Sequence, residues 1–366
     1  MVNYYLSTLK KLEDNGYKAY VVGGYVRNLL LGEREVDVDI ITDAVPMEMK
    51  KIFNNVKSVN NEYGSIKLYV KNHIIDITTF RREIGYKNGK PIKIEYTKNL
   101  EEDLKRRDFT MNTLVMDKNG KIYDFMNGTS DIKNRIIKPV KDVNILFKED
   151  ASRLLRGLRF MSSLDMKFDK SIINYIKNNK SDFLLISPNK KKEEFDKLFK
   201  YNPAKFLKFI KDYGLEDYIG IKCDKFVYTN SLVASYAQLT ISKPLPFTKY
   251  EKEQIKDIRR ILKKKKVDMM DLYKYGLYIS LCAGEILGLS KKKINLMYTN
   301  LPIKGIIEIN ITSEKICDVL NITPGKELGT IWKLLEKEIV NGKLINEEEK
   351  IIERLRWYNG QYKKNV

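Results

Sequence analysis

Two aspartates near the N-terminus have the residue type and spacing to bind a metal ion. Asp37 and Asp39 alternate with branched apolar residues in the run VDVDII. Alternate side chains of a β-strand point to one face, so both carboxylates would share a face while Val38 and Ile40 point to the other. Two close carboxylates repel unless a cation lies between them, and Mg²⁺ binds carboxylate oxygens together with substrate phosphates. The pattern therefore indicates a magnesium site that handles phosphate.

A glycine turn lies a few residues before this pair. The run YVV is typical of a buried strand, and Gly23 and Gly24 connect it to YVRNLLL, which has a helical pattern. Glycines let backbone amides approach a ligand, and a helix start favours anions. Gly24 and Arg27 are therefore candidates to contact a triphosphate, with an ordinary strand-to-helix turn as the alternative. The Gly-Lys-Ser/Thr ending of a P-loop is absent.

A further arginine occurs in RRDFTMN. Arg107 could form an ion pair at the end of a strand. Close to a triphosphate site, its planar guanidinium would instead supply several donors to phosphate oxygens.

The run EDASRLLRGLRF combines an acceptor with regularly spaced donors. Arg153, Arg156 and Arg159 recur every three residues, and Asp150 comes one turn earlier, so the four would line one stripe of a helix. Asp150 offers only acceptors and Arg153 only donors. Such a pair matches the edge of cytosine or adenine and does not match uracil or guanine. The alternative is a helix stabilised by ion pairs between neighbouring turns.

The charge of the chain indicates a polyanionic partner. The 366 residues include 68 Lys and Arg against 48 Asp and Glu, a net charge of +20. Binding to phosphates with release of counterions favours such a surplus, although a general bias towards lysine would also produce it. The single histidine, His73, excludes histidine-rich metal centres and histidine-based triads.

The elements that position these residues fall into two regions. Up to about residue 137, strand patterns such as AYVV, SIKLYV and HIIDITTF mix with helical ones, whereas the later patterns are helical almost throughout. This arrangement predicts an α+β fold, with a mixed sheet followed by a long helical part. No stretch approaches the roughly 18 apolar residues of a membrane span. Three scattered cysteines indicate a reduced, cytoplasmic protein.

Five segments, taken in order, resemble the class II, bacterial-type CCA-adding tRNA nucleotidyltransferases. They are GGYVRNLLLG, DVD, RRDFTMN, DFMNGTSDIKNRII and EDASRLLRGLRF. These enzymes share their head with bacterial poly(A) polymerases in the DNA polymerase β superfamily. The run LNITPGKELGTIWKLLEKEIVNGKLINEEE is similar to the tail element of the same enzymes. The resemblance implies a polymerase β-like nucleotidyltransferase head over residues 1–137 and all-helical neck (138–200), body (201–270) and tail (271–366).

The resemblance also implies an activity, which is the addition of C, C and A to the 3′ end of tRNA from CTP and ATP. Asp37 and Asp39 would hold two Mg²⁺ ions that activate the tRNA 3′-hydroxyl and stabilise the leaving pyrophosphate. The triphosphate would contact Gly24, Arg27 and Arg107. Asp150 and Arg153 would read the base as a protein template, supported by Arg156 and Arg159. The tail would bind tRNA, and neither a membrane nor an obligate protein partner is implied.

Several alternatives share these motifs, namely a CC-only or A-only enzyme, a poly(A) polymerase, and an inactive RNA-binding relative. CC-only enzymes typically lack most of the loop between Asp76 and Arg107, which is present here as RREIGYKNGKPIKIEY. This loop is one residue shorter than usual for the family. Asn28 also stands where the family usually has aspartate, and Asn189-Lys190 stands where Glu-Arg is usual. Neither the metal-binding nor the base-reading candidates are affected.

Overall fold

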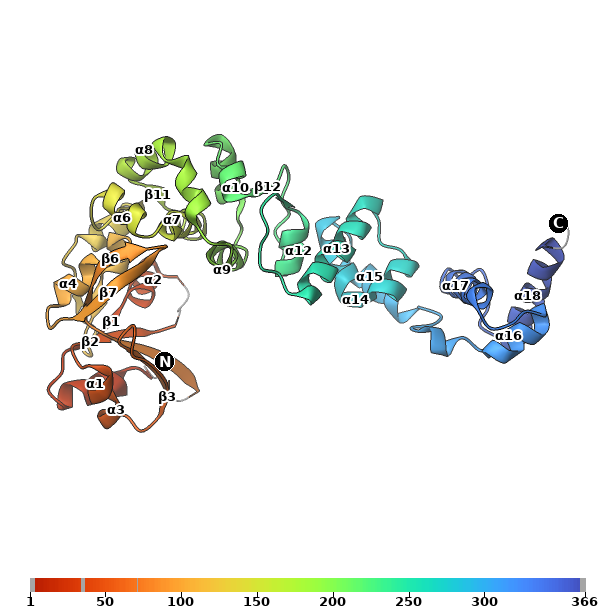
Figure 1. The fold of residues 1–366 in the computed structure, drawn as a ribbon, viewed down its shortest axis with the longest axis horizontal. Helices are drawn as coiled ribbons and strands as arrows, with labels where there is room; N and C mark the ends of the chain where they lie inside the picture. The colour runs from red at the N-terminus through yellow and green to blue at the C-terminus, as the bar shows by residue number, and fades with distance from the viewer. Residues whose placement is uncertain (1–3, 34–36, 71, 363–366) are drawn as a thin grey trace. The chain divides into compact units, whose positions relative to one another are not determined.

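The computed structural model describes residues 4–33, 37–70 and 72–362 (Figure 1). The chain forms two compact units. The first consists of Met1–Lys222 with Ile241–Pro246, and the second of Cys223–Thr240 with Phe247–Val366. Each unit is described by itself.

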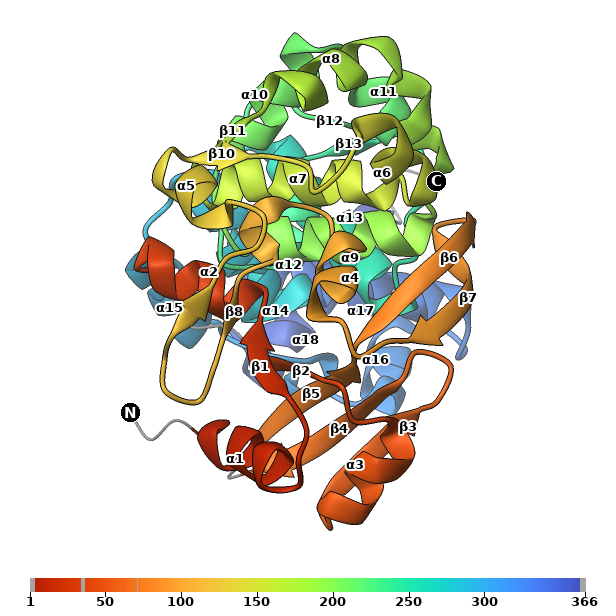
Figure 2. The same ribbon diagram turned by 90° about the vertical axis from the view of Figure 1, so that its left-hand side faces the viewer.

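A mixed seven-stranded sheet forms the N-terminal part of the first unit (Figure 2). Only β2 and β5 run parallel, and the other neighbouring strands pair antiparallel. In spatial order the strands are β3 (Val56–Asn60), β4 (Ser65–Val70), β5 (His73–Thr79), β2 (Asp39–Thr42), β1 (Ala19–Val22), β8 (Val115–Met116) and β9 (Ile122–Tyr123).

Three helices accompany the first strands, namely α1 (Leu6–Asp14), α2 (Gly24–Leu31) and α3 (Pro46–Ile52). α1 buries Leu9 and Leu12 completely. α3 begins where proline is favoured, at the first helical position, and Glu48 accepts a hydrogen bond from the Val45 N–H at 2.8 Å. The turn at Gly23, with φ of 75°, connects β1 to α2.

A separate two-stranded hairpin follows the sheet strands. β6 (Arg81–Lys87) and β7 (Lys90–Tyr96) pair antiparallel and are joined by Asn88 and Gly89, whose φ angles are 54° and 74°. Asn-Gly favours this two-residue turn because both positions need a positive φ. The sequence analysis treated this segment as a loop, so the hairpin is a difference from expectation.

The remainder of the first unit is largely helical and is centred on α7 (Ser152–Ser163), which buries Leu154, Leu155 and Leu158. The other helices are α4 (Leu100–Lys105), α5 (Gly128–Lys133), α6 (Val143–Glu149), α8 (Lys170–Asn178), α9 (Pro188–Leu198), α10 (Ala204–Asp212) and α11 (Glu216–Ile219). Two-residue strands β10 (Ile136–Ile137) and β11 (Lys167–Phe168) pair with each other. The short strands β12 (Ile221–Lys222) and β13 (Thr240–Ile241) fall at the boundary between the two units. Short 3-10 turns lie at Thr110–Asn112 and Lys180–Leu185.

The second unit is built from helices around its own apolar core. Leu272, Ile294, Leu335 and Ile351 are among its most buried members. The helices are α12 (Leu232–Ala237), α13 (Lys249–Lys264), α14 (Met269–Ile286), α15 (Lys291–Thr299), α16 (Ser313–Leu320), α17 (Lys326–Val340) and α18 (Glu348–Tyr362), with a 3-10 turn at Ile306–Glu308.

The structure confirms the predicted α+β class, a mixed sheet with helices followed by a largely helical remainder. The strand around VDVDII is shorter than predicted: β2 begins at Asp39, Asp37 precedes it, and Val36 lies outside the described residues. In the part of the chain that the structure describes, no helix has the length and apolar character to cross a membrane. Cys223, Cys282 and Cys317 are free thiols.

Candidate active site

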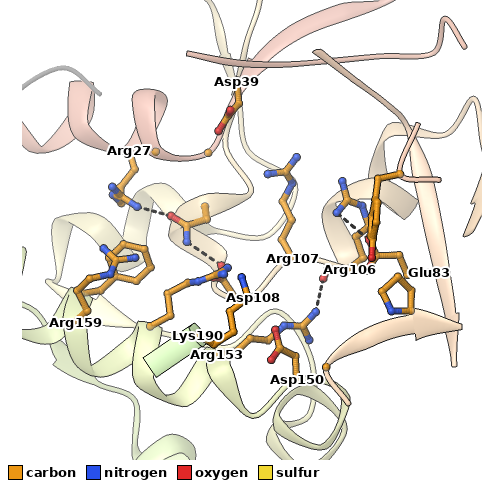
Figure 3. Close-up of a pocket in the computed structure, with 18 of the residues that line it drawn as sticks. Arg27, Asp39, Glu83, Arg106, Arg107, Asp108, Asp150, Arg153, Arg159 and Lys190 are labelled. Atoms are coloured by element: carbon orange, nitrogen blue, oxygen red, sulfur yellow. Dashed lines mark hydrogen bonds and ion pairs between the residues drawn. The ribbon is translucent and has the colours of Figure 1, made fainter. Parts of the chain in front are cut away.

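One cavity of the first unit brings together every candidate residue from the sequence analysis. It has a volume of about 650 Å³, which is within the range of small-molecule pockets. Figure 3 shows Asp39 at the top of this cavity, Asp150 and Arg153 at the bottom, and Arg107 between them. The candidates that line it are Gly24, Arg27, Asp37, Asp39, Arg107, Asp150, Arg153, Arg156 and Arg159.

The carboxylate pair lies beside the glycine turn because of the strand register. Asp39 on β2 is opposite Val22, the last residue of β1 before Gly23. Val38 and Ile40 are buried, while Asp37 and Asp39 stay accessible, as the alternation predicted.

The electrostatics around Asp39 favour the binding of a cation. Desolvation raises the pKa of Asp39 to about 6; Arg107 opposes this shift, and the charges of Asp76 and Asp37 add to it. Asp76 lies opposite Asp39 on the neighbouring parallel strand and is bound to Lys67 at 3.3 Å. A positive ion between these carboxylates would relieve the repulsion.

The donor set fits a hard divalent ion such as Mg²⁺, which takes oxygen ligands. Among the described residues, no group of three or more His, Cys, Asp or Glu side chains is placed to hold a metal ion by itself. Asp37 and Asp39 would therefore need substrate phosphates or water to complete the coordination, as is usual for Mg²⁺ at phosphate-handling sites.

The residues predicted to contact a triphosphate, Gly24, Arg27 and Arg107, line the cavity together with Gly23, and we call this part of it the phosphate corner. A Cβ on Gly23 would lie 3.6 Å from Nη1 of Arg107, so the guanidinium is packed against the turn. Nη2 of Arg107 donates to Asp103 at 3.2 Å, whereas its Nε is buried and has no hydrogen-bond partner among the described residues. A buried donor that lacks an acceptor is costly, and an anion in this corner would satisfy it.

Two buried carboxylates that the sequence analysis missed hold this region. Asp103 is completely buried and accepts from Nε of Arg106 at 2.9 Å as well as from Arg107. Glu83, on the β6–β7 hairpin, pairs with Arg81 at 2.7 Å and with Arg106 at 3.3 Å. The hairpin is therefore tied by ion pairs to the same segment that carries Arg107.

Asp150 lies outside the helical stripe that the sequence analysis predicted. α6 ends at Glu149 and α7 begins at Ser152, so Asp150 has an extended backbone between two helices. Its Oδ1 accepts a hydrogen bond from the Ser152 N–H at 2.9 Å, the geometry of a cap at a helix start. A Cβ on Gly89, at the tip of the hairpin, would lie 3.0 Å from the same oxygen.

Arg153 is buried and held by three acceptors. Its Nη1 donates to Glu149 at 2.7 Å and to the Leu146 carbonyl at 3.1 Å, and its Nη2 donates to the Arg106 carbonyl at 3.0 Å. Burial alone would lower the pKa of Arg153, but the bond to Glu149 and nearby negative groups raise it. The ring of Tyr86, from the hairpin, lies 5.7 Å from its guanidinium.

The other two arginines of α7 connect it to α9 and to the sheet region. Arg156 pairs with Asp108 at 3.1 Å and with Glu194 at 3.6 Å, and Arg159 pairs with Glu194 at 2.6 Å. The ion pairs that Asp108 and Glu194 form were not predicted from the sequence, because their partners lie 48 and 35 residues away along the chain.

The cavity wall is strongly basic. Lys190 and Lys197 of α9 join the seven arginines that line it, against five acidic side chains. Lysines in the run KKKEEFDK looked like a solvated helix face, so the sequence did not single them out. The excess of positive charge favours a polyanionic ligand.

Comparison with known proteins gives the class that this fold and cavity define. Residues 19–138 match the family described as Poly A polymerase head domain, and residues 227–355 match tRNA nucleotidyltransferase domain 2. The first of these regions holds the carboxylate pair and the phosphate corner. The molecule is therefore a nucleotidyltransferase, a class that generally depends on divalent metal ions.

Relatives that match over nearly the whole chain give the family. The CCA-adding enzyme of Ligilactobacillus salivarius is 34% identical, over 95% of this chain and 94% of the relative. The CCA-adding enzyme of Streptococcus agalactiae is 33% identical, over 96% of both. The Bacillus stearothermophilus CCA-adding enzyme, solved in complex with CTP, matches with a TM-score of 0.87 and 25% identity over 100% of both chains. The chain belongs to the family of CCA-adding enzymes, as the sequence motifs predicted.

Proposed function

We propose that this chain adds C, C and A in turn to the 3′ end of tRNA, using CTP and ATP and no nucleic-acid template. The observation that carries the proposal is the single cavity that combines a carboxylate pair, a phosphate corner and an Asp/Arg pair. Its relatives are named CCA-adding enzymes, and one of them was solved with CTP. Those names support both the reaction and the substrates.

Each addition is a nucleotidyl transfer. The 3′-hydroxyl oxygen of tRNA attacks the α-phosphorus of the nucleotide, and a new phosphodiester bond forms. The bond from that phosphorus to the oxygen of the β-phosphate breaks, pyrophosphate leaves with the electron pair, and the hydroxyl proton passes to solvent. Asp37 and Asp39 would hold two Mg²⁺ ions, which when bound favour ionisation of the hydroxyl and neutralise charge on the leaving group.

The glycine turn and its arginines orient the triphosphate. Backbone amides at Gly24 can approach phosphate oxygens because no side chain intervenes. Arg107 keeps a buried Nε–H without an acceptor, and Arg27 reaches the same corner from α2. Arginines placed before the ligand arrives stabilise developing negative charge without reorganisation.

Asp150 and Arg153 select the base. A carboxylate accepts from the exocyclic amine of cytosine or adenine, while the guanidinium donates to ring acceptors. Three of the five Arg153 N–H groups bind protein acceptors, which leaves two for a base. Uracil and guanine present the opposite pattern at the position of Asp150. Arg156 and Arg159 fix α7 against α9 and the sheet region, and so support this geometry.

The roles of the segments follow from what they carry. Residues 1–137 form the catalytic head, 138–200 the neck that recognises the nucleotide, 201–270 the body, and 271–366 the tRNA-binding tail. Exposed lysines of the second unit would contact the tRNA backbone, because phosphate neutralisation supplies affinity regardless of sequence. They include Lys265, Lys266, Lys291, Lys292 and Lys293. Free cysteines and a tRNA substrate favour the cytoplasm.

The β6–β7 hairpin favours full CCA addition over CC addition alone. It lies between Asp76 and Arg107, where CC-only relatives typically lack most of the loop. Its tip at Gly89 approaches Asp150, and Tyr86 approaches Arg153, so the hairpin touches the base-reading pair directly.

The test is the length of the product made on tRNA that lacks CCA. We expect CTP alone to add two residues, ATP alone to add none, and both together to add three. A matched tRNA that already ends in CC should accept one A from ATP. A product that stops at two residues with both nucleotides would identify a CC-only enzyme. A long tail from ATP alone would identify a poly(A) polymerase, and no extension under any condition would overturn the proposal.

A further inference from the structure

The buried arginine of α2 has an unusual set of partners. Arg27 is only 6% exposed. Its Nε and Nη2 both donate to Oδ1 of Asn28, at 3.1 and 2.7 Å, and its Nη1 donates to Oδ1 of Asn112 at 2.7 Å. Within the ranges that the structure describes, no carboxylate forms an ion pair with this guanidinium. Amide oxygens orient the group, but they do not neutralise its charge.

The carboxylates nearby are bound to other arginines. Asn112 donates to Asp108 at 2.8 Å, but Asp108 already pairs with Arg156. Glu194 pairs with Arg159. Both carboxylates are therefore already paired with other arginines.

A second cation lies close to Arg27 across one aromatic ring. Arg27 and Arg159 stand 4.7 and 4.2 Å from the centroid of the Phe160 ring. Burial lowers the pKa of Arg27 to about 10, Arg159 adds to this shift, and Asp108 opposes it. A fall in the pKa of a buried arginine indicates a positive charge that its surroundings compensate incompletely.

A buried guanidinium whose charge is incompletely compensated favours a ligand with negative charge. Burying an ion without a counter-ion is costly, and that cost is recovered when an anion binds next to it. Three of the five N–H groups of Arg27 are used by Asn28 and Asn112, which leaves two donors. Arg27 lines the same cavity as Gly23 and Gly24.

We infer that Asn28 sets the affinity of this cavity for polyphosphate by leaving Arg27 without a counter-ion until the ligand supplies one. Asn28 is a positioning residue: it orients Arg27 and preserves its charge for the phosphate chain. Aspartate, which has the same shape, would neutralise Arg27 in the empty protein. The inference rests on the proposed nucleotide site and concerns the phosphate chain only, not the base or the chemical step.

The test compares the wild-type protein with Asn28→Asp in thermal unfolding and in binding of inorganic tripolyphosphate without divalent ions. We expect Asn28→Asp to unfold at a higher temperature when empty. We also expect it to bind tripolyphosphate about tenfold more weakly, the effect of losing one charge-assisted contact. The rise in unfolding temperature at saturating tripolyphosphate should shrink accordingly. Asn119→Asp, at an exposed turn, adds the same charge away from the cavity and should match wild type.

A second variant separates charge from orientation. Asn28→Ala removes the acceptor without adding charge, so the empty protein should unfold at a lower temperature and tripolyphosphate binding should also weaken. If Asn28→Asp does not fold, Asn28→Ala tests the orienting role of Asn28 by itself, and unchanged tripolyphosphate binding by the folded variant would overturn the inference.

Unchanged tripolyphosphate affinity in folded Asn28→Asp would overturn the inference, and so would equal weakening in Asn119→Asp. These outcomes are distinct from failure of the proposed function, which is judged by extension of tRNA by the wild-type protein.

Discussion

Arg27 and Arg153 line one cavity, are each 6% exposed, and each make three hydrogen bonds. Arg27 belongs to the proposed phosphate end of the cavity and Arg153 to the proposed base end. Their partners differ in charge. Arg27 is held by two neutral amides, whereas Arg153 is held by the Glu149 carboxylate and two backbone carbonyls. Burial lowers the pKa of Arg27 to about 10, whereas the pKa of Arg153 is raised because the bond to Glu149 and nearby negative groups outweigh the effect of burial.

This difference in charge gives one cavity two kinds of buried arginine. A guanidinium without a counter-ion attracts phosphate mainly through its charge, and the exact geometry of its donors matters less for this attraction. A guanidinium neutralised by Glu149 has less attraction for phosphate, so its remaining donors can discriminate hydrogen-bond patterns on a base. We therefore expect substitutions at the phosphate end to change affinity and rate, and substitutions at the base end to change selectivity.

The largest effect is expected at the carboxylate pair beside the phosphate end. Asp39→Asn, and separately Asp37→Asn, should reduce nucleotide transfer by at least about a thousandfold, because metal binding supplies several kcal/mol of transition-state stabilisation. Single-turnover extension of tRNA lacking CCA measures the loss. Circular dichroism and the unfolding temperature should show a folded protein. Near-normal transfer by either folded variant would contradict the assignment of the pair.

A smaller effect is expected when Arg153 is deprived of its counter-ion, so that its charge is left unbalanced like that of Arg27. Glu149→Gln keeps a hydrogen-bond acceptor for Arg153 but removes the balancing charge. The preference for CTP over UTP should fall by about tenfold, in the range of one impaired base contact, with tripolyphosphate affinity equal or higher. Competition between the two triphosphates measures this ratio. An unchanged ratio would show that neutralisation of Arg153 does not matter for base choice.

The smallest effect concerns the hairpin tip at the base end. Gly89→Ala places a Cβ about 3 Å from the Asp150 carboxylate and strains a residue with φ of 74°. Gly120→Ala is the matched control, because it has φ of 80° and open space around the new Cβ. Both should lose about 1–2 kcal/mol of stability. Only Gly89→Ala should change the preference between CTP and ATP, by a few fold. An equal change in both variants would show that the hairpin does not take part in base selection.

Local sequence patterns were sufficient to predict many of the helices and strands and to identify the charged candidate residues of the site. β1, β4 and α2 match the sequence expectations because their apolar residues repeat with the period of the element. The carboxylate pair was recognised because its alternation with Val38 and Ile40 is a local signal of a strand face. Family motifs then connected distant segments that no local pattern relates.

Contacts distant in sequence account for what was missed. Asp108 and Glu194 are buried beside arginines of α7 that lie 48 and 35 residues away along the chain, so nothing in their immediate sequence indicates these ion pairs. Asp103 is different, because its partners Arg106 and Arg107 follow it by three and four residues, a spacing that the sequence itself contains. The hairpin had a usable signal in Asn88-Gly89, which favours a two-residue turn. The break at Asp150 was hidden because arginine spacing and apolar residues continue a helical pattern across it.

The central claim is that the protein itself selects the base, through Asp150 and Arg153, in the cavity where transfer occurs. The most direct measurement is the relative incorporation of all four nucleotides into tRNA lacking CCA by wild type, Asp150→Ala, Arg153→Ala and the double variant. Each lost contact should reduce discrimination by about 1–3 kcal/mol, so CMP incorporation falls and UMP or GMP incorporation rises relative to it. Folded variants that keep the wild-type preference for CTP and ATP would contradict the claim and reduce the pair to a structural role.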